Sequence, residues 1–130
     1  MSEKIIKNWM VLAEYDIKTA EAMLSAKRYI YVAFMCQQTI EKICKAIYVK
    51  ETQQTPPYTH NLTRLAELIS TSNKMSCLHK DFLERLNYFY LESRYSENLT
   101  ELYKSVGEKE AVQLYKETKE VYQWLLDLVK

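Results

Sequence analysis

The scarcity of glycine and proline constrains the fold of this sequence more than any other feature. The chain has one glycine and two prolines in 130 residues. An all-β domain needs many tight turns, for which these two residues supply the backbone conformations. Long helices joined by short connections need few of them. Hydrophobic residues make up 48% of the chain and charged residues 27%, a globular balance that allows a buried core without metals or disulfides. The sequence therefore predicts one all-α domain over residues 1–130.

Apolar residues recur at three- and four-residue spacings in five segments, which is the period of a helix with one buried face. The segments cover about 3–26, 29–50, 60–72, 77–92 and 108–129. Pro56-Pro57 places a loop at 51–59, because consecutive prolines stop helices and hold the chain extended. We expect 94–107 to be a surface connection with room for one helical turn. The predicted architecture is an antiparallel up-and-down bundle of four to five helices.

Charge, apolar patterning and cysteine content narrow the class of protein further. A formal net charge of +1 argues against a dedicated duplex-DNA binder, which usually has a basic surplus. The charged start MSEKIIKNW is unlike a signal peptide, and no apolar stretch approaches the 18 residues of a membrane span. The three cysteines, Cys36, Cys44 and Cys77, match no common zinc spacing. We interpret them as small buried or half-buried hydrophobic residues of a cytoplasmic protein.

The motifs of most enzyme classes are missing from the sequence. A single glycine cannot build a phosphate-binding loop, and the chain has no His-Glu-x-x-His and no paired Cys-x-x-Cys. With two histidines and no nucleophile elbow, no Ser-His-Asp set is credible. We therefore expect no metal, no cofactor and no catalytic residues of these classes.

A polar stripe in the second segment is the first candidate site. Gln38, Glu41, Lys42 and Lys45 project from one side of the predicted helix, because residues three and four apart are neighbours. Two interpretations remain open. The stripe is a solvated face stabilised by a Glu41–Lys45 ion pair, or it is a recognition surface. In the second case the lysines hold phosphate and Gln38 contacts a polar ligand or a partner.

The second candidate is the aromatic and basic cluster at 88–95, which ends in Arg94 and Tyr95. Tyrosine rings can stack on bases, and an arginine can bind phosphate through its fork of donors. The alternative is packing or a dimer surface, because tyrosine also packs at bundle edges with its hydroxyl in water. His60, at the start of a predicted helix, has either a structural role or a place beside these candidates.

Four motifs in order along residues 9–95 carry a resemblance to a known family. They are Trp9-x3-Ala13-x2-Asp16-Ile17-x2-Ala20, Tyr29-x3-Ala33-Phe34-x2-Gln37-Gln38-x2-Glu41-Lys42-x2-Lys45-Ala46, Pro57 with Thr59-His60-x-Leu62-x2-Leu65, and Ser93-Arg94-Tyr95. Together they resemble the HEPN domain family, small helical bundles of prokaryotes and of some large animal proteins. The resemblance implies a four- or five-helix bundle that forms a homodimer.

The same resemblance implies one of two kinds of function. Many HEPN proteins are metal-independent RNases, often toxins, with an Arg-x4-6-His motif. Others lack that motif and bind nucleotides or act as accessory subunits beside a small nucleotidyltransferase. Here no histidine follows Arg94, and Arg28, Arg64 and Arg85 have none at the needed distance. Ser96 also stands where a related subfamily has proline after Arg-Tyr.

The leading hypothesis from the sequence is therefore a non-catalytic protein that binds a nucleotide or a nucleotide-bearing partner, as a homodimer. Its candidate residues are Gln38, Glu41, Lys42, Lys45, His60, Arg94 and Tyr95. The alternative is a protein-interaction subunit that partners a small nucleotidyltransferase in a toxin–antitoxin-type pair. An RNase with a relocated motif ranks third, because cleavage without a metal needs an acid or base and a cation near the scissile phosphate.

Overall fold

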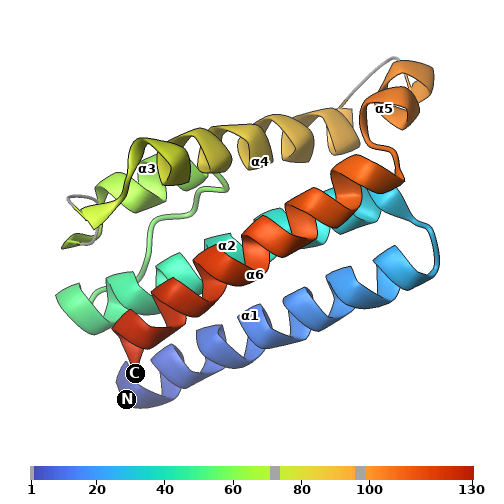
Figure 1. Cartoon of the computed structure of the whole chain (residues 1–130). Coiled ribbons are helices and arrows are strands. Elements are labelled where there is room, and N and C mark those ends of the chain that lie inside the picture. Colours follow the sequence, from blue (N-terminus) through green and yellow to red (C-terminus); the bar gives the residue numbers. More distant parts are fainter. Residues whose placement is uncertain (1, 71–73, 96–98) are drawn as a thin grey trace.

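The computed structural model describes residues 2–70, 74–95 and 99–130, except for the side chains of 91–95, 99, 102 and 103. In this part of the chain the helices are α1 (Ser2–Ser25), α2 (Tyr29–Thr52), α3 (Leu62–Glu67), α4 (Cys77–Tyr95), α5 (Leu99–Ser105) and α6 (Glu108–Val129). The four long helices alternate in direction along the sequence (Figure 1). The predicted all-α antiparallel bundle is confirmed. No described helix is both long enough and apolar enough to cross a membrane.

Helix α2 is the centre of the bundle, because it packs against α1, α3, α4 and α6. The apolar stripe predicted for this helix is buried from Ala33 to Ile47. Further buried residues, among them Val32, Thr39 and Ala46, lie on other sides of the same helix. A helix that is covered on most of its circumference must also bury polar side chains. The position of α2 therefore determines the environment of the candidate polar stripe.

Two boundaries differ from the prediction. The third helix ends at Glu67, and the backbone N–H of Ser70 then donates to the Glu51 carboxylate at 2.9 Å, which ties the chain to the end of α2. The segment 94–107, predicted to be a surface connection, instead contains the seven-residue helix α5 and the end of α4. A helix of two turns is too short for an apolar period to stand out in a sequence.

The cysteines occupy two kinds of environment. Cys36 and Cys44 are buried in the core and Cys77 is exposed. Burial raises the pKa of both the Cys36 and the Cys44 thiol to about 12, and the nearby negative charge of Glu41 adds to the effect at Cys44. The interpretation as small buried hydrophobic residues is confirmed for these two.

The first prediction concerns thiol reactivity. At pH 8 we expect iodoacetamide to alkylate Cys77 rapidly in the folded protein and to leave Cys36 and Cys44 unmodified, because the thiolate is the reactive form and burial suppresses it. Mass spectrometry of the alkylated protein measures this. Cys77→Ser should remove the fast reaction, and guanidinium should expose the other two thiols. Rapid native modification at three positions would contradict the described packing.

Candidate functional site

A buried carboxylate lies at the centre of the polar stripe of α2. The side chain of Glu41 is only 4% exposed. Its Oε1 atom is 2.8 Å from His60 Nδ1 and accepts a hydrogen bond from Gln37 Nε2 at 3.2 Å. Its Oε2 atom accepts from Lys45 Nζ at 3.1 Å, and the side chain of Lys45 is 7% exposed. A buried charge is tolerated when it is paired and hydrogen-bonded, and Glu41 meets both conditions.

The same network attaches α2 to the loop that precedes α3. Gln37 Nε2 also donates to the backbone carbonyl of His60 at 2.7 Å. Gln38 Nε2 donates to Gln37 Oε1 at 2.7 Å, which orients the Gln37 amide. Both the backbone carbonyl and the ring of His60 therefore attach this loop to α2. Through these contacts, Gln37, Gln38 and Glu41 hold the side chains of Lys45 and His60 in place.

A second buried ion pair connects α2 to α1. Lys42 Nζ lies 2.5 Å from Asp16 Oδ2, and both side chains are largely buried. Within the predicted stripe, Glu41 and Lys45 are therefore buried, and Gln38 and Lys42 are half-buried. The interpretation of this stripe as a solvated face is wrong, although the predicted Glu41–Lys45 ion pair is confirmed. The sequence alone could not reveal this, because it did not show that α2 is covered by α1 on this side.

Aromatic rings surround the exposed side of His60. The centroid of its ring lies 5.2 Å from that of Tyr90 and 5.8 Å from that of Tyr58. Tyr90 in turn stacks on Phe34 with centroids 5.5 Å apart. The His60 side chain is 42% exposed, and Nδ1 is the ring nitrogen that contacts Glu41. Tyr58 forms one edge of an open pocket, and His60 lies beside that edge.

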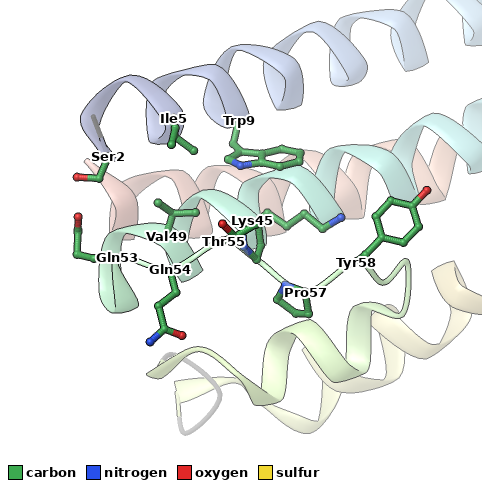
Figure 2. Close-up of a pocket in the computed structure, with 11 residues that line it drawn as sticks. Ser2, Ile5, Trp9, Lys45, Val49, Gln53, Gln54, Thr55, Pro57 and Tyr58 are labelled. Carbon is green, nitrogen blue, oxygen red and sulfur yellow. The ribbon is translucent and has the colours of Figure 1, made fainter.

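This pocket lies between the start of α1, the end of α2 and the loop after α2 (Figure 2). Its volume is about 640 Å³. It is lined by Ser2, Ile5, Trp9, Lys45, Val49, Gln53, Gln54, Thr55, Pro56, Pro57 and Tyr58. Lys45 Nζ is 5.4 Å from the centroid of the Trp9 ring, and it points toward the space between Trp9 and Tyr58 (Figure 2). The pocket thus combines two aromatic side chains with one ammonium group.

The structure brings together only some of the residues proposed from sequence. Lys45 lines the pocket, and Glu41 and His60 contact one another beside it. Gln38 is connected to this pair by its hydrogen bond to Gln37. Lys42 is directed at Asp16 of α1. The side chains of Arg94 and Tyr95 lie outside the described residues. Among the described residues, no group of three or more His, Cys, Asp and Glu side chains could hold a metal ion.

Sequence reasoning missed the two aromatic members of the pocket as site residues. Trp9 lies in the first predicted helix, and it is partly buried and packed against the core. Tyr58 follows the two prolines and is 95% exposed, which is unusual for a tyrosine. The available signals were the position of Trp9 in the first family motif and an aromatic residue directly after Pro56-Pro57.

Comparison with known proteins assigns the fold and the family. A family model for the HEPN domain matches residues 6–128. The chain belongs to the HEPN domain family. The protein TT1696 from Thermus thermophilus is a structural neighbour, with a TM-score of 0.82 and 14% identity over 94% of this chain and 96% of that one. At this identity the likeness shows a common fold and nothing more. No curated protein matches the sequence.

The second prediction concerns the Glu41–Lys45 ion pair. Glu41→Met should lower the free energy of unfolding by about 3–5 kcal/mol, because it leaves the buried ammonium of Lys45 unpaired. The double variant Glu41→Met/Lys45→Met removes both charges and should be less destabilised than the single variant. Urea unfolding measures both values.

The exposed pair of Glu14 and Lys18 on α1 provides the matched control. Glu14→Met should cost less than about 1 kcal/mol, because exposed ion pairs contribute little. If the double variant lost as much free energy of unfolding as Glu41→Met and Lys45→Met lose together, the two charges would not be coupled.

Proposed function

We propose that this HEPN protein is non-catalytic and binds a nucleotide, or a partner that carries one, in the pocket lined by Trp9, Lys45 and Tyr58. The observation that carries the proposal is the combination of two aromatic side chains and an ammonium group in one pocket of about 640 Å³. That volume is within the usual range for small-molecule sites. Aromatic side chains offer stacking surfaces to any base, because every base has a π-face.

In this proposal the other candidates of the polar stripe act by position. The Glu41 carboxylate accepts a hydrogen bond from the Lys45 ammonium, and His60 and Gln37 contact the other oxygen of the same carboxylate. Lys42 contributes to the α1–α2 contact instead of binding phosphate, because Asp16 already pairs with it. Arg94 and Tyr95 remain predictions from sequence. The non-catalytic part of the proposal rests on the absence of a histidine within the Arg-x4-6-His distance of any arginine.

The third prediction tests ligand binding. We expect at least one of the four ribonucleoside monophosphates to raise the thermal midpoint, since a ligand at 100 times its dissociation constant stabilises the fold by about 2.7 kcal/mol. Tyr58→Ala should weaken that binding by about 1–3 kcal/mol without loss of stability, because Tyr58 is 95% exposed and would supply stacking area.

Tyr31→Ala is the matched control, since Tyr31 is an exposed tyrosine of α2 that does not line the pocket. Its affinity for the nucleotide should equal that of the unmodified protein. A flat response to nucleoside monophosphates, nucleoside triphosphates and a short RNA would contradict the proposal and favour the interaction subunit.

The homodimer is the second part of the proposal, and an exposed apolar face of α1 supports it. Ile5, Val11, Leu12 and Tyr15 are all exposed on this helix. At 100° per residue they fall on one side, next to the face that packs on α2. Clustered exposed apolar side chains are typical of protein interfaces. In the alternative function, the same face would bind a small nucleotidyltransferase instead of a second copy.

The fourth prediction tests this interface. Light scattering after size-exclusion chromatography should give twice the 15.5 kDa of the chain, and Leu12→Lys/Tyr15→Lys should give the monomer mass. A lysine ammonium in an apolar interface would lose its water without gaining a charged partner, which disfavours the dimer. Val112→Lys, at an exposed apolar position of α6, should remain dimeric. A monomer at all concentrations would contradict the homodimer, and co-purification with the nucleotidyltransferase would then test the alternative.

A further inference from the structure

The charges around the pocket are balanced. Lys45 is the one charged residue among the described residues that line it. Its ammonium group is paired with the Glu41 carboxylate at 3.1 Å, and His60 contacts the other oxygen of the same carboxylate. The nearby Lys42 is paired with Asp16, and Lys50 Nζ donates to the last backbone carbonyls of the chain, at Val129 and Lys130. The pocket therefore has no surplus cation from these side chains.

The loop that borders the pocket also has few backbone donors. Pro56 and Pro57 have no N–H group. The N–H of Gln53 donates to the Val49 carbonyl at 2.8 Å, and that of Gln54 to Thr52 Oγ1 at 3.1 Å. Phosphate-binding loops work in the opposite way, with several backbone N–H groups directed at the phosphate. Among the loop residues that line the pocket, only Thr55 and Tyr58 keep a backbone N–H group outside these bonds, which is fewer than such a cradle uses.

The helix ends at the pocket add no net charge either. The start of α1 at Ser2 and the last turn of α2 near Val49 and Gln53 both line it. A helix start carries about half a positive charge and a helix end about half a negative one, so their effects on an anion oppose each other. A triphosphate in this pocket would lose water around several charges without gaining equivalent partners.

We infer that the pocket recognises the heteroaromatic base of its ligand and is indifferent to the number of phosphates, so that a nucleoside binds as well as its mono-, di- and triphosphate. The inference rests on the proposed function and specifies its ligand. The base lies against Trp9 and Tyr58, Lys45 provides one polar contact, and any phosphate remains in solvent. The pocket thus differs from a site for nucleoside triphosphates, in which phosphate contacts supply much of the affinity.

A fluorescence titration tests the inference directly. The chain has two tryptophans, so Trp124→Phe leaves Trp9 as the single reporter. Adenosine, AMP, ADP and ATP, and the same series for the base that binds best, are titrated at 50 and 200 mM salt. We expect quenching of Trp9, affinities within about threefold of one another along the series, and little salt dependence, because Lys45, the one charged side chain among the described residues of the lining, is already paired with Glu41.

Two results would overturn the inference, and they are distinguishable. An affinity that rises about tenfold or more from nucleoside to triphosphate and falls with salt would mean that phosphate is recognised, while the proposed function would stand. The absence of quenching and of thermal stabilisation with every member of the series would remove the proposed function itself.

A charge-releasing variant provides a second test. Glu41→Gln keeps the shape of the side chain and leaves the Lys45 charge unbalanced, so the preference for ATP over adenosine should increase by about tenfold. Glu14→Gln, in the exposed pair with Lys18, should not change that preference. An unchanged preference in a folded Glu41→Gln protein would contradict the charge balance. If this variant does not fold, the phosphate series on Trp124→Phe still decides.

Discussion

The buried carboxylate of Glu41 and its three donors are the constraint on which the rest of the site depends. A carboxylate in the interior is unstable unless its lone pairs are occupied, and here a lysine, a histidine and a glutamine occupy them. Two of these donors come from α2 itself and the third, His60, from the loop before α3. The requirement to pair one charge therefore determines where that loop lies, and with it the open edge of the pocket.

The pocket forms because three segments meet around the end of α2 (Figure 2). The apolar core between α1 and α2 and the Asp16–Lys42 ion pair hold the two helices together, and Trp9 of α1 lies over Lys45. The Glu41–His60 contact holds the loop on the other side, which places Tyr58 at the edge. Since ion pairs within the core contribute to both arrangements, the stripe of α2 has a structural role, and the proposed function adds a binding role to it. Lys45 is the residue in which the two roles coincide.

The agreement between sequence and structure follows the length of each element. The long helices were predictable because their apolar residues repeat over several turns, as in the segment from Ala33 to Ile47. The two short helices agreed less well: α3 ends at Glu67, before the predicted end near residue 72, and the seven-residue α5 was not predicted, because short segments have few apolar positions to define a period. The Glu41–Lys45 pair was predictable from a spacing of four residues, but its burial was not, since spacing within one helix carries no information about neighbouring helices.

The sequence by itself determined the all-α class, the approximate extent of the long helices, membership of the HEPN family and the absence of its Arg-x4-6-His motif. These properties depend on local periodicity and on residues at fixed spacings. Only the tertiary structure decided that Glu41 and Lys45 are buried and that Trp9 and Tyr58 line one pocket with Lys45. The physical reason is that burial and charge pairing depend on segments far apart in the chain, and α1 and the loop reach Glu41 and Lys45 only when the bundle is assembled.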